Sequence, residues 1–478
     1  MPTEDVMYLD KLLHKGSLTI EELKNYLANY ADIVIYPNTP SNQSISFYLR
    51  GMTDNIQIND YYRTIMTKLK SKDGDRNSLD LPPLYRIGKF EDVMSRVFSG
   101  YLIFYKEGDH QLYALNAAKV PQRTPEESST EIAIKGPKDG FTEELDTNVS
   151  LIRKRLNTEY LYNETFQIGS LSNTSVSLLY LHHKASLSTI EEARQRLQSL
   201  QVESVISSGQ LEQWISDKKM SLFPLYDSSG RVDFAVECLL KGRFIIVVNG
   251  SPTVLIGPVN IFSLLKSPED IHYPYYLVAF QRVFRLFSLL IAIFLPGFWI
   301  SIASVNIDLI PFNLLATVVE ARRGMPLPFF LEFLFLLALF EILREAGIRM
   351  PKPVGQTIAV VGGLIIGDAL IRAGLASATL IVVIALSTVA TYTLVNQSII
   401  GTVTIIRLYM VIISGLLGIY GFLLGVVTIV VYLSRLESYS LSYVEPVVSF
   451  KFNKILSIFL ISPIKVGRQT GKQKKGEK

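Results

Sequence analysis

The chain has 478 residues, a formal net charge of +4, and 19% of its residues are Lys, Arg, Asp or Glu. Only 14 of these charged residues lie among the 151 residues from 284 to 434, whereas ordinary soluble domains carry roughly 25% charged residues. This composition argues against a purely soluble enzyme, and the single cysteine, Cys238, excludes an intrachain disulfide framework.

Charge and hydropathy divide the chain into a water-soluble part and a membrane part. The first residues, 1–5, lack the basic-then-apolar order of a signal peptide, so we expect the first domain in the cytosol. The fold class that we expect is an α/β two-lobed cytoplasmic N-terminal domain followed by an all-α multi-span transmembrane domain. The expected segments are a cytoplasmic α/β lobe (1–120), a connector and helix (121–156), a second cytoplasmic α/β lobe (157–270), a transmembrane helical domain (271–435) and a basic cytoplasmic tail (436–478).

The two lobes repeat one plan, in which a short helix precedes a glycine, a strand, a turn and a second strand. Three glycines of the first lobe recur 142 positions later: Gly88, Gly100 and Gly108 become Gly230, Gly242 and Gly250. Glycines at a fixed offset on matching predicted elements favour an internal duplication. Apolar periodicity also predicts amphipathic helices at 60–69 and 189–200.

A glycine-rich segment, Lys135–Glu143, follows the polar connector. It contains Gly136, Pro137, Gly140 and Phe141, but the glycines are one position too close for a phosphate-binding loop, and Phe141 stands where lysine is needed. We therefore interpret it as a hinged turn before a helix at 142–156. That helix ends with the basic run Arg153 to Arg155, which suits the negative C-terminal end of a helix.

No catalytic or metal-binding pattern is evident in the soluble part. His182 and His183 are adjacent, and neighbours on a strand point to opposite faces, so they are poorly placed to share a metal ion. We predict that the protein is not an enzyme, has no cofactor and no metal site, and does not bind nucleic acid.

Five apolar runs in the membrane part are candidate spans, since a span needs about 20 apolar residues. They are 286–304, 326–343, 354–371, 378–395 and 403–433. The last run would be about 46 Å long as one helix, against a hydrocarbon core of about 30 Å, so it is either strongly tilted or folded as a hairpin near Ser414-Gly415.

Basic residues precede the first run and follow the last, which places both ends in the cytoplasm and requires an even number of crossings. We favour six crossings, and four crossings with a re-entrant piece is the rival. Arg322 and Arg323 fall on the outer side in the six-crossing scheme, which counts against it.

Ionisable residues inside an apolar block are costly unless they face protein or water, so they are candidate functional residues. Glu332 has no partner within one helical turn, and Asp368 either pairs with Arg372 or faces a water path. A second group has the spacing of local ion pairs on a helix: Glu341, Arg344, Glu345 and Arg349.

The third run carries small residues at helical spacing, which favours a close packing face against another helix or subunit. Gly363 and Gly367 form a GxxxG pattern, and Thr357 and Asp368 offer a polar face. We therefore treat Thr357, Gly363, Gly367, Asp368 and Glu332 as candidates for lining or gating a pore.

Several long motifs resemble one family. The chain reads KGPKDGFTE at 135–143 and LIRKRL at 151–156, with Gly250-Ser251-Pro252 further on. It continues with Pro326-Leu327-Pro328, then FEILREAGIRMP at 340–351, which ends at Pro351, and GGLIIG at 362–367. These motifs are similar to those of the A subunits of spore germinant receptors, the GerA family of endospore formers.

The resemblance implies a two-lobed cytoplasmic domain before a multi-span domain in the spore inner membrane. It implies a transporter-like, nutrient-binding B subunit and a lipoprotein C subunit as partners. It also implies a homo-oligomer, expected to be a pentamer, that forms a nutrient-gated channel for monovalent cations. The alternatives are an auxiliary paralogue similar to stage V sporulation protein AF, which amplifies ion release, and a secondary transporter with Glu332 as its proton or substrate site.

Overall fold

The computed structural model describes residues 4–36, 44–54, 56–59, 84–119, 135–349, 367–445 and 447. The helix expected at 60–69 and most of the apolar run at 354–371 lie outside these residues. The chain forms two compact units, and each takes up a short segment from elsewhere in the sequence. The α/β unit comprises 1–221, 225–259 and 438–441, and the helical unit comprises 222–224, 260–437 and 442–478.

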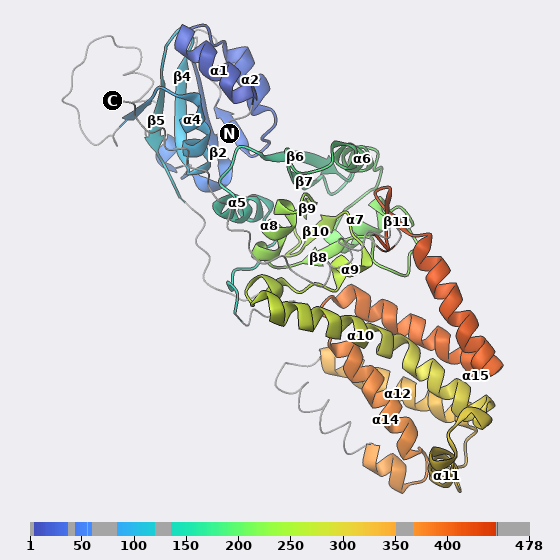
Figure 1. Cartoon of the computed structure of the whole chain (residues 1–478). Coiled ribbons are helices and arrows are strands. Elements are labelled where there is room, and N and C mark those ends of the chain that lie inside the picture. Colours follow the sequence, from blue (N-terminus) through green and yellow to red (C-terminus); the bar gives the residue numbers. More distant parts are fainter. Residues whose placement is uncertain are drawn as a thin grey trace, which may run out of the picture. The chain divides into compact units, whose positions relative to one another are not determined.

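The first lobe of the α/β unit is a five-stranded antiparallel sheet with the order β1-β2-β4-β5-β3 (Figure 1). Its strands are β1 (Ile33–Tyr36), β2 (Ser44–Leu49), β3 (Leu84–Ile87), β4 (Tyr101–Lys106) and β5 (Leu112–Asn116). Its helices are α1 (Glu4–Lys15), α2 (Ile20–Leu27) and α4 (Phe90–Phe98), with a short 3-10 turn at Arg50–Met52. Helix α2 begins with a capping box, in which Thr19 and Glu22 each bond the other's backbone N–H.

The second lobe repeats the first, because its sheet has the corresponding order β6-β7-β9-β10-β8. Its strands are β6 (Leu161–Ile168), β7 (Thr174–Leu181), β8 (Asp227–Ser229), β9 (Phe244–Val248) and β10 (Val254–Gly257). Its helices are α5 (Leu145–Arg155), α6 (Leu187–Gln198), α7 (Ser208–Ile215) and α8 (Val232–Leu240). The strand order therefore supports the duplication that the glycine spacing predicts.

The repeated glycines have a physical reason. Gly100 and Gly242 follow α4 and α8 with φ angles of +89° and +84°, and Gly108 and Gly250 turn the hairpins with φ angles of +87° and +86°. Residues with a Cβ rarely adopt this left-handed region, so the same backbone turn requires glycine in both lobes.

The sheet of the second lobe is buried on both faces. Helices α5 and α8 pack on one face, where Ile245 and Val247 of β9 join their core. Phe244, Ile246 and Val248 point to the other face and are equally buried. This explains why β9 is a continuous apolar run.

The helical unit contains α9 (Ile261–Leu264), α10 (Tyr275–Ile300), α11 (Phe312–Ala321), α12 (Phe329–Arg349), α14 (Ala378–Tyr392) and α15 (Gln397–Ser434). Helix α10 packs against α14 and α15, and a π-helical turn at Ser301–Val305 extends it. Two 3-10 turns, Pro268–Ile271 and Ile307–Leu309, connect these helices. A short strand pair, β11 (Glu437–Ser438) with β12 (Leu441–Ser442), follows α15. Helix α11 lies between the predicted apolar runs 286–304 and 326–343 and was not expected.

Among the described residues, two helices are long and apolar enough to cross a membrane, Tyr275–Val305 and Gln397–Ser434. Helix α14 has only 15 residues, because Asn396 caps the start of α15 immediately after it. The six crossings expected from the sequence are therefore not established by the described helices.

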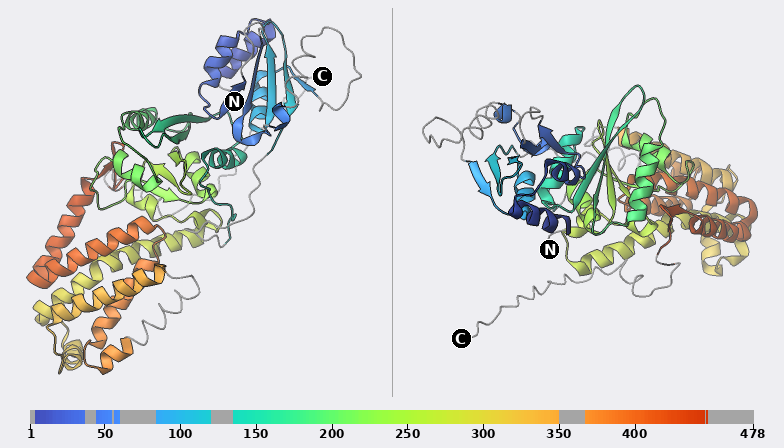
Figure 2. Two further views of the ribbon diagram at one scale, coloured as in Figure 1. Left: turned by 180° about the vertical axis from the view of Figure 1, so that it is seen from behind. Right: turned by 90° about the horizontal axis from the view of Figure 1, so that it is seen from above.

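Helix α15 is folded as a hairpin, as one of the two sequence alternatives predicts. Its backbone leaves the helical region at Gly418, where φ is 62° and ψ is −141°. The hydroxyls of Tyr409 and Thr428 lie 2.8 Å apart, although a straight helix would separate these residues by about 28 Å. Figures 1 and 2 show the two arms.

Candidate functional site

The motif at 135–143 fastens the start of α5 to the second lobe. Gly140 bridges Arg231, and the Phe141 amide donates to the Gly230 carbonyl at 2.9 Å, while the Phe141 ring is buried. Thr142 and Asn148 exchange two hydrogen bonds of 2.6 and 2.7 Å. Gly136 and Pro137 lie in the irregular segment before this clip. The motif therefore has a structural role, because its contacts hold the start of α5 against the second lobe.

Arg153, near the end of α5, joins the two lobes. Its guanidinium donates two hydrogen bonds to the Asp32 carboxylate, at 2.8 and 3.1 Å, and both side chains are buried. The guanidinium also lies 4.5 Å from the centre of the Phe98 ring. Arg155, two residues further, pairs with Asp139. The basic end of α5 therefore makes specific ion pairs in addition to any interaction with the helix dipole.

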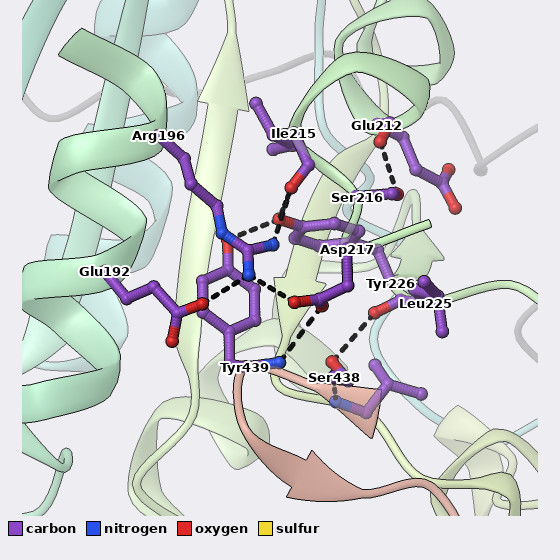
Figure 3. Close-up of polar contacts among 11 residues, drawn as sticks. Glu192, Arg196, Glu212, Ile215, Ser216, Asp217, Leu225, Tyr226, Ser438 and Tyr439 are labelled. Atoms are coloured by element: carbon purple, nitrogen blue, oxygen red, sulfur yellow. Dashed lines mark hydrogen bonds and ion pairs between the residues drawn. The ribbon is translucent and has the colours of Figure 1, made fainter. Parts of the chain in front are cut away.

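The most elaborate polar cluster of the α/β unit surrounds Tyr439 (Figure 3). The Tyr439 ring is 2% exposed, and the Arg196 guanidinium lies 4.3 Å from its centre. The ring meets Phe244 edge to face, and its hydroxyl is hydrogen-bonded to that of Tyr226. Arg196 in turn pairs with Glu192 and Asp217. We call Arg196, Asp217, Tyr226 and Tyr439 the Tyr439 clamp.

Backbone contacts hold the same segment in place. The Tyr439 amide donates to the Asp217 carboxylate at 3.2 Å, and the Ser438 hydroxyl donates to the Leu225 carbonyl at 3.1 Å. Tyr439 and Ser440 both have left-handed φ angles, 55° and 59°. Non-glycine residues adopt this region at a cost of about 1–3 kcal/mol each, so the surrounding contacts must hold them there.

Burial sets the protonation of the clamp. It raises the pKa of the Tyr226 and Tyr439 phenols, so both remain neutral hydrogen-bonding groups. Nearby on α7, burial and the negative charge of Asp227 raise the pKa of Glu212 to about 7. The two phenols therefore stay neutral near neutral pH, whereas the nearby carboxyl of Glu212 titrates there.

In the helical unit, Glu332 lies in the first turn of α12 and is fully buried. One carboxylate oxygen accepts a hydrogen bond of 2.6 Å from the amide of Ser377, the residue that caps the start of α14. Two helix N-termini, those of α12 and α14, thus meet at one carboxylate. Backbone amides at helix N-termini are hydrogen-bond donors, so both helix ends suit a carboxylate side chain at this position.

A second buried charge, on Arg407 of α15, connects three helices. Its guanidinium lies 3.3 Å from the Glu341 carboxylate of α12 and 3.4 Å from the hydroxyls of Ser387 and Thr391 on α14. Glu341 also pairs with Arg344. The local spacing predicts the Glu341–Arg344 pair, but it gives no indication of the link to Arg407, which is 66 residues away.

The remaining candidates are less enclosed. Asp368 pairs with Arg372 at 2.7 Å, and the two side chains are 60% and 79% exposed. Gly367 lies at the start of the same helical segment, while Glu345 and Arg349 lie in α12. Thr357, Gly363 and Pro351 lie outside the described residues. A role for any of these residues in a pore stays a prediction.

No group of three or more His, Cys, Asp or Glu side chains that could hold a metal ion occurs in the part of the chain that the structure describes. His182 stacks on the Tyr162 ring, and His183 meets Tyr160 edge to face. Both histidines therefore have aromatic neighbours.

Sequence reasoning missed the Tyr439 clamp. Its members are separated by up to 243 positions, from Arg196 to Tyr439, and no periodic pattern connects them. A signal was present, since three tyrosines (Tyr439, Tyr443 and Tyr432) cluster around the end of the last apolar run, where a basic tail was expected.

Known proteins have sequences similar to this one. A family model for Bacillus/Clostridium GerA spore germination protein matches residues 21–472. The chain is 44% identical over 356 residues to spore germination protein XA of Bacillus anthracis, which covers 74% of this chain and 72% of that protein. It is 30% identical over 422 residues to the uncharacterized membrane protein YfkQ of Bacillus subtilis (strain 168), covering 87% and 82%.

A crystal structure of the N-terminal domain of the A subunit of the Bacillus megaterium spore germinant receptor GerK3 aligns with 26% identity and a TM-score of 0.37. The alignment covers 50% of this chain and 94% of that one. With the family model matching nearly the whole sequence and XA sharing 44% identity, the chain belongs to the GerA family of spore germination proteins, the family of germinant receptor A-type subunits.

Proposed function

We propose that this protein is the A subunit of a nutrient germinant receptor in the spore inner membrane. Its helical unit inserts into the membrane and oligomerises, as a pentamer in the form we favour, around a path for monovalent cations. A transporter-like B subunit binds the nutrient, a lipoprotein C subunit completes the receptor, and the resulting ion release starts germination.

The observation that carries this proposal is the polarity of the helical unit in a chain that matches the GerA family over residues 21–472. Large apolar side chains are exposed along α10 and both arms of α15, including Phe280, Phe284, Phe287, Leu416, Leu423 and Leu424. Charged side chains such as Glu332 and Arg407 are buried inside. This distribution is unfavourable in water and favourable in lipid.

Conduction is tested at Asp368, whose exposed carboxylate would raise the local cation concentration if several copies lined one path. Receptors reconstituted with their partner subunits are expected to lose part of their cation-over-anion selectivity with Asp368→Asn, seen as a reversal potential closer to zero. Glu320→Gln removes another exposed, ion-paired carboxylate and serves as the matched control. Equal reversal potentials for wild type and Asp368→Asn would contradict this role.

Assembly is tested separately, by purifying the tagged chain from spore membranes and counting protomers. Co-purification of B and C subunits supports the receptor. An oligomer that conducts without nutrient-binding partners supports the auxiliary paralogue instead. Uptake that saturates and requires a coupling gradient would identify a transporter.

A further inference from the structure

A cluster of buried oxygen atoms at the start of α14 has a ligand still to be assigned. Glu332 is 0% exposed, and only one of its two carboxylate oxygens has a hydrogen-bond partner among the described residues, the Ser377 amide at 2.6 Å. The other oxygen, Oε2, is buried and without a partner within that part of the chain. A buried carboxylate oxygen left in this way costs free energy unless something binds it.

Two further buried hydroxyl oxygens belong to residues at the start of α14, where Glu332 binds. The Ser377 hydroxyl is also buried and unpartnered within the described residues, and it belongs to the residue whose amide binds Glu332. Thr379, in the first turn of the same helix, carries a third buried hydroxyl oxygen without a partner there. A serine at this position normally caps its helix by accepting a hydrogen bond from an amide of the first turn, but the Ser377 hydroxyl makes no such bond.

Oxygen atoms of carboxylate and hydroxyl groups are ligands for hard cations, which have no preference for nitrogen or sulfur. The Ser377 and Thr379 hydroxyls form no hydrogen bond with Glu332 Oε2. All three oxygens can nevertheless bind one cation, because each oxygen has to contact only the ion and not the other two oxygens. No Lys, Arg or His side chain pairs with Glu332 in the described part of the protein. The site therefore offers one negative charge and several neutral oxygens.

We propose that Glu332, Ser377 and Thr379 form a binding site for a monovalent alkali cation within the helical unit. One carboxylate balances one positive charge. A divalent ion would leave a net charge buried, and it is usually bound by several carboxylates. A bound alkali ion joins α12 to α14, so it stabilises the packing of the two helices. This inference goes beyond the proposed function, since it requires no conduction and no partner subunit.

The test uses the purified full-length chain in detergent, with NaCl, KCl or choline chloride at equal ionic strength and constant pH. The thermal unfolding midpoint is expected to rise saturably with Na⁺ or K⁺ but not with choline. Well above half-saturation, each tenfold increase in the ion adds about 1.4 kcal/mol to the free energy of unfolding. Glu332→Gln should abolish the alkali-specific rise, and Glu320→Gln, at an exposed carboxylate, should keep it.

Ser377→Ala, which retains the carboxylate, should weaken the apparent alkali affinity about tenfold, and it decides the test if Glu332→Gln does not fold. Equal midpoints in alkali and choline salts would overturn the proposal. An alkali-specific rise of the midpoint that survives in both Glu332→Gln and Ser377→Ala would also overturn it. So would a midpoint that responds only to pH, since Glu332 would then hold a proton. Because no ion flux is measured, absence of channel activity would leave the result unaffected.

Discussion

Arg153 links the two lobes through a buried ion pair with Asp32. Replacing it by alanine leaves the Asp32 carboxylate buried without its partner, and breaking a buried ion pair in this way costs about 3–5 kcal/mol. We expect Arg153→Ala to lower the thermal unfolding midpoint of the full-length protein, followed by tryptophan fluorescence from Trp214 and Trp299.

Lys154 is the matched control for this substitution, because it is the next residue on α5 and its side chain is exposed. Lys154→Ala should change the free energy of unfolding by no more than about 0.5 kcal/mol. If the two variants unfolded at the same temperature, Arg153 would not hold the lobes together.

Glu212 gives the α/β unit a pH dependence with a definite sign. Burial and Asp227 raise its pKa from 4.5 to about 7 in the folded protein, so the folded state holds this proton more tightly than the unfolded chain does. Stability from this group is complete below pH 4.5 and is lost as the pH rises through 7. Unfolding midpoints measured from pH 5 to 8 should fall more steeply for wild type than for Glu212→Gln, and parallel profiles would refute this.

At the scale of single elements, the α15 hairpin depends on Gly418. Its positive φ disfavours any side chain, and a Cβ at this position would lie 2.2 Å from the Asn306 side-chain oxygen. That oxygen accepts a hydrogen bond of 2.9 Å from the Ile419 amide, so it caps the second arm. Gly418→Ala is expected to destabilise the helical unit by at least about 1–3 kcal/mol, measured as a lower unfolding midpoint in detergent.

Gly401, in the first arm, is a suitable control because a Cβ there would meet no atom within 4 Å. Gly401→Ala should leave stability unchanged or raise it by about 0.4–1 kcal/mol, since alanine restricts the unfolded chain. If Gly418→Ala and Gly401→Ala were equally stable, α15 would not depend on the left-handed turn at Gly418 for its stability.

The same elements show how far local sequence predicts this structure. The repeated glycines predict the hairpin of each lobe, because a turn with positive φ requires glycine at one position. The length of the last apolar run predicts that α15 folds back on itself. The turn lies at Gly418, beyond the predicted Ser414, because several glycines of this run suit a bend and only the contact with Asn306 selects one. Asp32 and Arg153 are 121 residues apart, so their pairing leaves no local pattern.

At the scale of the whole molecule, Tyr439 lies five residues beyond the end of α15 in the sequence, yet it belongs to the α/β unit. Tyr439→Ala removes a buried aromatic ring, at about 3–5 kcal/mol, and loosens residues 438–441 within that unit. Under the proposed function, spores carrying this variant should release ions more slowly after nutrient addition. Tyr439→Phe, which loses only the hydroxyl, should be milder, and Tyr420→Ala, at a 78% exposed tyrosine, should behave as wild type. Normal ion release by Tyr439→Ala would exclude a role for the clamp in signalling.

The clamp also sets an order of events on the ribosome. Its last member, Tyr439, is translated only after residues 260–437, which form most of the helical unit. At typical synthesis rates of about 5–20 residues per second, this delay is roughly 10–35 seconds. During that interval the nascent second lobe presents Tyr226 and Asp217 without the segment that covers them, so a chaperone or protease could distinguish an unfinished chain from one whose last helix has been completed.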